Sequence, residues 1–289
     1  MPGAQHGASV AGQACFELLE VHRGGLRQQR QHPRPLLRLR LRCHERAPLG
    51  FGAIDAAQKL GIEPTGRRYA GLDVADEGAD KNAMAFRHGI RLQHLHSWSG
   101  QNSDIFKTVV RAFALCEQYG HETFHYDADG LGAGVRGDAN RINEERDAAG
   151  KLHINDQPFR GSGQVCDPEG ELVPKRKNKD FFANSNAQAW WALRMRFQAT
   201  YRAVIEKLPY AADDLISIDP QLEELLPLTM ELSQPTYSIN TVGKILIDKA
   251  PDGTRSPNLA DAVMIAFQPS SRGLEVWLKL GEQISDLLT

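Results

Sequence analysis

Three aspartates stand at the ends of apolar segments that are far apart in the sequence. Asp73 ends the strand-like run YAGLD, Asp127 ends the run ETFHYD, and Asp261 falls in the first turn of the helix-like NLADAVMIAF. Carboxylate oxygens are hard ligands suited to Mg²⁺ or Mn²⁺. Two such ions about 4 Å apart can activate water and stabilise the leaving oxygen of a phosphodiester. The three aspartates are therefore candidate ligands of a metal site, provided that the fold brings them together.

A purely structural role for these aspartates is the alternative. Asp73 and Asp127 both end apolar strands, where a buried charge without a partner carries a large desolvation cost. Three carboxylates brought together without cations would also repel one another. We therefore favour the metal site over the structural role.

The hydrophobic pattern predicts the elements that must position the acids. A hairpin, a third strand, an amphipathic helix and a fourth strand are expected at residues 69–89, 90–98, 102–120 and 122–128. Ser103 is expected to cap the helix and Gly120 to end it. Sites in α/β sheets form at the carboxyl ends of strands, so Asp73 and Asp127 are expected at one edge of the sheet.

The second half of the chain is predicted to be mostly helical. A polar connection over 150–179 ends in the basic cluster PKRKNKD, and two helices, two short strands and a last helix are expected at 183–207, 222–229, 236–240, 244–248 and from 258 onward. Asn258 is expected to cap the last helix, with Asp261 in its first turn.

The segment DADGLGAGV carries three glycines after the fourth strand. Their spacing is similar to that of a dinucleotide-binding fingerprint, but the glycines do not follow the order of that motif. We interpret them instead as residues that let a helix start close beside Asp127. The sequence contains no GxxxxGK[ST] segment, so we expect no ATPase activity.

Composition indicates a globular protein with local rather than overall basic character. The formal net charge is −2, but Met1 to Pro48 holds eight Arg, no Lys and three Glu, so it carries +5 and the remainder −7. The four cysteines form no CxxC pair, which favours a reducing compartment. No apolar run approaches the roughly 20 residues of a membrane span, and no signal peptide is evident. We expect a soluble protein of the cytoplasm.

Three segments are expected. Residues 1–48 are Arg-rich and irregular, and we interpret them as disordered or as an aberrant start such as a shifted reading frame, with a basic DNA-binding arm as the alternative. Residues 49–270 are predicted to form one α/β domain. Residues 271–289 are predicted to form an amphipathic helix that packs on the domain or on a partner.

The predicted order of strands and helices resembles the ribonuclease H-like fold, a mixed central sheet flanked by helices. Four motifs, GLDVADEGADK, YDADGLGAGV, KNKDFFANSNAQAWWALRMRF and DKAPDGTRSPNLADAVMIAF, together resemble the carboxyl-terminal nuclease domain of the large terminase subunit of tailed phages and prophages. The resemblance covers roughly residues 50 to 270. Large terminases also carry an amino-terminal ATPase domain, which this chain lacks, so a truncated prophage gene is one interpretation and a dedicated nuclease is another.

The resemblance implies a metal-dependent DNA endonuclease that cuts concatemeric viral DNA during head filling in the bacterial host. It implies that Asp73, Asp127 and Asp261 hold two Mg²⁺ or Mn²⁺ ions. Asp80 and Asp129 are auxiliary ligands or turn and capping residues. The basic residues Arg176, Lys177 and Lys179 are candidates for contact with double-stranded DNA, and the portal protein and the small terminase subunit are the partners that the family implies.

Two rivals to this interpretation remain open. One is another ribonuclease H-like nuclease, such as a junction resolvase or an RNA-strand hydrolase, which substrate preference would distinguish. The other is a chain that only binds, either as a docking module for the portal or small terminase subunit or as an inactive relic. Metal binding without cleavage would favour the second.

Overall fold

The computed structural model describes residues 49–75, 81–100 and 104–269. The chain divides into two units, Met1–Ala47 and Pro48–Thr289, and every described residue belongs to the second. The predictions for residues 1–48 and 271–289 and for Asp80 lie outside the described residues.

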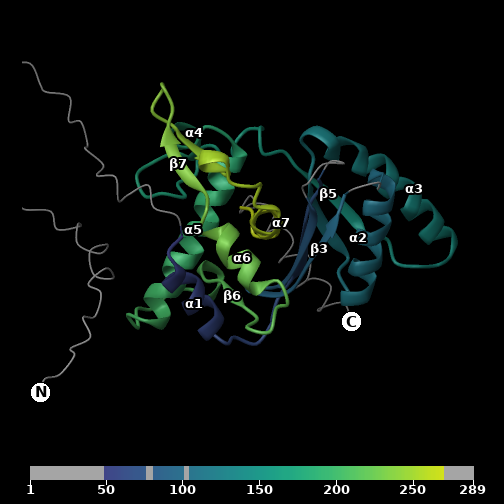
Figure 1. Ribbon diagram of the computed structural model, residues 1–289, viewed down its shortest axis with the longest axis horizontal. Helices are drawn as coiled ribbons and strands as arrows, with labels where there is room; N and C mark the ends of the chain where they lie inside the picture. Colours follow the sequence, from purple (N-terminus) through teal and green to yellow (C-terminus); the bar gives the residue numbers. More distant parts are fainter. Residues whose placement is uncertain (1–48, 76–80, 101–103, 270–289) are drawn as a thin grey trace, which may run out of the picture. The chain divides into compact units, whose positions relative to one another are not determined.

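The described unit contains both helices and strands (Figure 1). The helices are α1 (Phe51–Lys59), α2 (Ile105–Tyr119), α3 (Val135–Ala148), α4 (Asn178–Phe181), α5 (Ser185–Val204), α6 (Leu225–Leu232) and α7 (Asn258–Ala266). The strands are β1 (Arg68–Asp73), β2 (Lys81–His88), β3 (Arg91–Ser99), β4 (Thr123–Asp127), β5 (Asn155–Phe159), β6 (Ser217–Ile218), β7 (Thr236–Ile239) and β8 (Ile245–Asp248). Short 3₁₀ turns are η2 (Gly130–Gly134), η3 (Ala212–Asp214) and η4 (Pro251–Gly253).

Six strands form one mixed sheet in the order β5-β4-β1-β2-β3-β6. The pairs β1–β2 and β2–β3 are antiparallel, whereas β1–β4, β4–β5 and β3–β6 are parallel. Strands β7 and β8 form a separate antiparallel hairpin. The predicted mixed sheet flanked by helices is confirmed, while β5 and β6 are additions to it.

Alternation along the strands divides the core into two layers. In β2, Met84 and Phe86 join a cluster with α2 and α3, and Ala83 and Ala85 join a second cluster with α1, α5, α6 and α7. Figure 1 shows α2 and α3 on one side of the strands and α1, α5 and α6 on the other. Ala70, Leu72, Phe124 and Tyr126 belong to the first cluster. Because successive side chains point to opposite faces, the residues that follow Leu72 and Tyr126 face the α7 side.

Helix α7 approaches the sheet closely because β1 carries a glycine. A Cβ atom added at Gly71 would lie 2.2 Å from the carbonyl oxygen of Ala262 and 2.5 Å from the amide nitrogen of Ala266. Only a residue without a side chain allows this backbone contact. All residues of α7 from Leu259 to Ala266 are buried, so the helix is part of the core.

Two predicted helix caps are corrected. The side chain that caps α2 is Asp104, which accepts a hydrogen bond from the Lys107 amide at 2.9 Å, and it replaces the predicted Ser103. Asn258 is the first residue of α7 instead of its cap, because Pro257 precedes it as the capping residue and no side chain from that position bonds to the helix. The predicted end of α2 is confirmed, since Gly120 has the left-handed φ of 66°.

None of the helices in residues 49–75, 81–100 and 104–269 has the length and apolar character needed to span a lipid bilayer.

Candidate functional site

Two of the three candidate aspartates end neighbouring parallel strands. In the pairing of β1 with β4, Leu72 lies opposite Tyr126, and the next residues are Asp73 and Asp127. Parallel strands end at the same edge of a sheet, and strand alternation turns both side chains toward α7. The prediction that these two carboxylates lie at one edge of the sheet is confirmed.

The third aspartate comes from α7. Asp261 lies in its first turn and is only 1% exposed, and Asp73 is 8% exposed. Burial raises the pKa of Asp73 well above its ordinary value, and repulsion from Asp261 and Asp127 raises it further. The three carboxylates therefore lie within electrostatic range of one another, in surroundings that disfavour negative charge.

A lysine that the sequence analysis did not single out compensates this charge. Lys249 follows β8, and its Nζ lies 2.7 Å from Oδ2 of the buried Asp261. Burial alone would lower the pKa of Lys249, but attraction to Asp261, Asp73 and Asp127 raises it overall. Lys249 is therefore the ion-pair partner of Asp261, and its positive charge also lies close enough to Asp73 and Asp127 to interact with them.

A glutamate on α6 also faces the acidic group. Glu231 Oε2 accepts a hydrogen bond from the Ala260 amide of α7 at 3.0 Å. Burial raises the pKa of Glu231 to about 7, and Asp261 adds to the shift, while hydrogen bonds from the amides of Ala260 and Leu259 oppose it. Nothing in the local sequence TMELS marks this residue, because its role arises only when α6 packs on α7.

One oxygen of the buried aspartate has no partner. Asp261 Oδ1 makes no hydrogen bond among the described residues, and neither does the buried indole nitrogen of Trp190. Burial raises the pKa of Asp261, and attraction from Lys249 and the nearby Trp190 indole offset this only in part. The carboxylate therefore has one strong partner, Lys249, and one weak neutral donor, the Trp190 indole, so its second oxygen can still accept a further ligand.

The side chains of Asp73, Asp127 and Asp261 are of the chemical kind that binds hard divalent cations. The three side chains offer only carboxylate oxygens, which are the ligands that Mg²⁺, Mn²⁺ and Ca²⁺ prefer. In the described part of the chain, however, no three His, Cys, Asp or Glu side chains stand close enough together to surround one ion. Lys249 is already bound to Asp261, so a cation would have to compete with its ammonium group for that carboxylate.

Asp129 lies near the site but is already bonded to a loop. Its carboxylate accepts hydrogen bonds from the Ser162 amide at 2.8 Å and from the Ser162 hydroxyl at 3.0 Å. Its own amide donates to Asp127 Oδ1 at 3.0 Å. Asp129 thus ties the loop after β5 to the end of β4. Its role as an auxiliary ligand stays a prediction.

The three predicted DNA-contacting residues lie away from the carboxylates, next to and within the short helix α4. Lys177 Nζ lies 2.8 Å from Glu169, and Lys179 forms a second ion pair with the same glutamate. The Arg176 guanidinium lies 5.9 Å from the centre of the Phe181 ring. Glu169 therefore offsets part of the positive charge that the sequence suggested.

A different arginine follows the carboxyl end of β5, next to the end of β4 that carries Asp127. Phe159 pairs with Asp127 in the register of β4 and β5, and the exposed Arg160 follows it directly. A cavity of about 390 Å³ opens here, lined by Pro158, Phe159, Arg160, Gly163, Gln164, Cys166, Ser185, Gln188, Gln268 and Pro269. Arg160 could not be singled out from the sequence, because the local pattern does not predict the strand β5 that precedes it.

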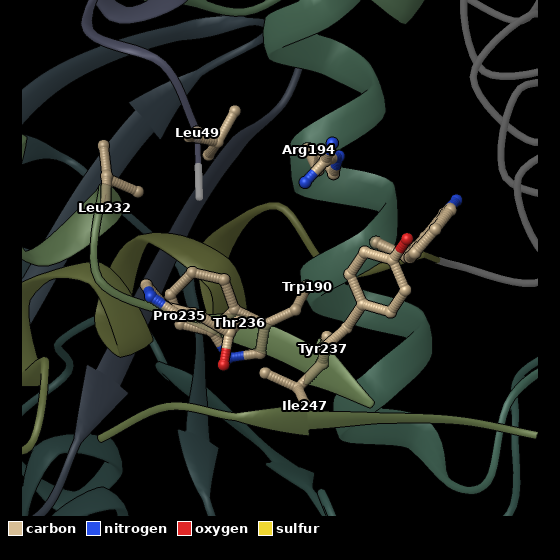
Figure 2. A pocket seen from close by; sticks show the side chains of 9 residues that line it. Leu49, Trp190, Arg194, Leu232, Pro235, Thr236, Tyr237 and Ile247 are labelled. Atoms are coloured by element: carbon tan, nitrogen blue, oxygen red, sulfur yellow. The ribbon is translucent and has the colours of Figure 1, made fainter. Parts of the chain in front are cut away.

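A second cavity lies between α5 and the β7–β8 hairpin (Figure 2). It is lined by Leu49, Trp190, Trp191, Arg194, Leu232, Pro235, Thr236, Tyr237 and Ile247. Its volume of about 30 Å³ is far below the roughly 300–1,000 Å³ of small-molecule sites. We interpret it as a packing gap beside Trp190.

Comparisons with known proteins give a consistent result. No protein-family model matches the chain, and no curated protein matches it. Among solved structures, the nuclease domain of the large terminase subunit gp2 of bacterial virus Sf6 is 30% identical, with a TM-score of 0.70, and the match covers 78% of this chain and 100% of that one. A mutant of that domain with manganese and beta-thujaplicinol has the same identity, coverage and TM-score. A mutant with calcium is 31% identical, with a TM-score of 0.69, over 77% of this chain and 99% of that one.

Proposed function

Because this chain belongs to the family of large terminase nuclease domains, with their ribonuclease H-like fold, we propose that it is a metal-dependent endonuclease that cuts double-stranded DNA during genome packaging. The observation that carries the proposal is that Asp73 and Asp127 end the neighbouring strands β1 and β4, while the buried Asp261 lies on α7, which packs on β1. The metals present in the relatives' structures, manganese and calcium, are hard divalent ions of the kind that this donor set fits.

Asp73, Asp127 and Asp261 are the residues that would hold two Mg²⁺ or Mn²⁺ ions. When bound, the ions would supply an activated water and stabilise the charge on the leaving oxygen of the phosphodiester. Asp73 and Asp261 are buried, so the protein itself desolvates them and makes a cation their favoured partner. Without metal, Lys249 forms an ion pair with the buried Asp261, so that carboxylate is not an unpaired charge in the core.

The DNA backbone is proposed to reach the site along the edge formed by the ends of β4 and β5. Arg160 is exposed at this edge beside the cavity, and a guanidinium there can bind a phosphate through two hydrogen bonds. Arg176, Lys177 and Lys179 remain proposed contacts farther along the duplex. The portal protein, the small terminase subunit and the host cytoplasm are proposed from the family alone.

Cleavage of supercoiled plasmid tests the proposal. The purified chain, Asp73→Asn and Asp261→Asn should each be incubated with Mg²⁺, Mn²⁺ or EDTA, with Asp213→Asn on the exposed turn η3 as the matched control. We expect nicking and linearisation by the wild type and the control with a metal, and none by the two site variants or with EDTA. A folded wild type that binds metal but leaves plasmid, branched DNA and RNA hybrids intact would overturn the nuclease and favour a docking role.

A further inference from the structure

Helix α7 begins inside the core without a cap of its own. Its first intrahelical hydrogen bond runs from the Asp261 amide to the Pro257 carbonyl at 2.7 Å, so the amides of the residues before Asp261 have no partner within the helix. Leu259 is 4% exposed and Ala260 is fully buried, so water cannot easily reach these amides. Pro257, which occupies the capping position, has no side-chain acceptor.

Glu231 supplies the missing acceptor from another helix. Its Oε2 accepts a hydrogen bond from the Ala260 amide at 3.0 Å, and the neighbouring Leu259 amide helps to lower the pKa of the same carboxyl. Leu228 and Leu232, which flank Glu231 on α6, are buried in the same core cluster as α7. The capping group is therefore held on a packed helix 29 residues away in sequence.

We propose that Glu231 is a positioning residue of the nuclease site, whose side chain caps α7 from α6 and so fixes Asp261 where it can act. The inference rests on the proposed function, because it concerns the ligand role of Asp261. The residue after the capped Ala260 is Asp261 itself. Fraying of this first turn would move the Asp261 carboxylate relative to Asp73, which is the last residue of β1.

The cap depends on an acceptor at the right distance and does not depend on negative charge. Glu231 lies near Asp261 and Asp73, and each of the three carboxylates disfavours the charge of the others. Gln retains the length of the side chain and a carbonyl oxygen that can accept from an amide. Asp retains the charge, but it is shorter by one methylene and withdraws the acceptor from the amides.

The experiment compares Glu231→Gln and Glu231→Asp in the full chain, with Met230→Gln as the control because Met230 is 59% exposed on the same helix. Three quantities are measured: the Mn²⁺ dissociation constant by calorimetry, the Mn²⁺ concentration for half-maximal plasmid nicking, and hydrogen exchange in a peptide spanning the start of α7. For Glu231→Gln and the control, we expect the Mn²⁺ dissociation constant, the Mn²⁺ concentration for half-maximal nicking and the exchange rate to stay within about threefold of the wild-type values. We expect Glu231→Asp to weaken Mn²⁺ binding tenfold or more and to speed exchange at Leu259 and Ala260.

The proposal is overturned if Glu231→Asp matches the wild type, or if Glu231→Gln weakens Mn²⁺ binding as much as Glu231→Asp does. The second pattern would make Glu231 a charged ligand. Hydrogen exchange needs neither metal nor DNA, so it tests the cap even if the wild type cuts nothing. If the variants differ from the wild type in exchange and Mn²⁺ affinity as expected, but the wild type cuts no DNA, the result would contradict the proposed function and leave the cap supported.

Discussion

Replacing Gly71 with alanine should disable the site without changing any chemical group in it. Gly71 lies two residues before Asp73, and its Cβ would stand 2.2 Å from the Ala262 carbonyl oxygen, whereas ordinary contacts begin at 3.4 Å. Both atoms that the Cβ would meet most closely belong to the backbone of α7, so no side chain can rotate away. The helix must therefore move away from β1 by roughly 1 Å, and Asp261 must move with it.

The size of both effects follows from this displacement. Overpacking of this kind typically costs about 1–3 kcal/mol of unfolding free energy, which corresponds to a fall in Tm of roughly 2–12 °C for a domain of this size. A misplacement of about 1 Å in a catalytic group can cost roughly 100-fold in rate. The loss of nicking should therefore be much larger than the loss of folded protein.

The assay pairs thermal unfolding with Mn²⁺-dependent plasmid nicking at a temperature well below the Tm of the variant. Gly137→Ala in α3 is the matched control, because a Cβ there meets nothing within 4 Å. It should raise stability by about 0.5–1 kcal/mol and leave nicking unchanged. A Gly71→Ala protein that nicks at the wild-type rate would refute the packing of α7 on β1 as the device that positions Asp261.

Three further predictions concern charge. Lys249→Met should lower the unfolding free energy by ~3–5 kcal/mol without metal, because it leaves the buried Asp261 unpaired. In a thermal-unfolding assay, Mn²⁺ should raise the Tm of this variant more than that of the wild type, and equal Tm shifts would contradict the ion-pair role of Lys249. Arg160→Gln should reduce the salt dependence of duplex binding by about one phosphate contact, measured by fluorescence anisotropy with Ca²⁺ at several salt concentrations. Lys177→Gln should reduce it less, because Lys177 is already paired with Glu169, and a larger effect of Lys177→Gln would count against DNA binding at the ends of β4 and β5. Burial lowers the pKa of His121, although hydrogen bonds to backbone carbonyls oppose this, so the stabilising effect of the neutral His121 is present above a pH of about 6.5 and is lost as the pH falls through the folded-state pKa. In urea unfolding, His121→Gln should therefore lose less stability than the wild type between pH 7 and pH 5, and identical losses would refute the lowered pKa of His121.

Strong local patterns made much of the fold predictable from sequence. Helix α2 repeats apolar residues at helical spacing and is followed by a glycine, and the sequence between β1 and β2 is rich in Asp and Gly. Asp73 and Asp127 could be placed together because each directly follows an apolar strand residue. Such signals depend only on a residue's near neighbours.

The missed features depend on contacts between distant segments. Strand β5 is mostly exposed and contains Pro158, and β6 has only two residues, so neither shows alternation. Lys249 lies in a turn-like segment, and Glu231 lies among apolar residues of a short helix. Their roles appear only when the β7–β8 hairpin and α6 pack beside α7, and no local pattern records that packing.

The most direct test of the central claim is a crystal of the chain soaked in Mn²⁺ and measured near the manganese absorption edge. We expect anomalous difference peaks in contact with Asp73, Asp127 and Asp261, with the Lys249 ammonium displaced from Asp261. Full-strength peaks elsewhere, or an intact Lys249–Asp261 pair with no peak at saturating Mn²⁺, would contradict the claim that these three acids form the metal site.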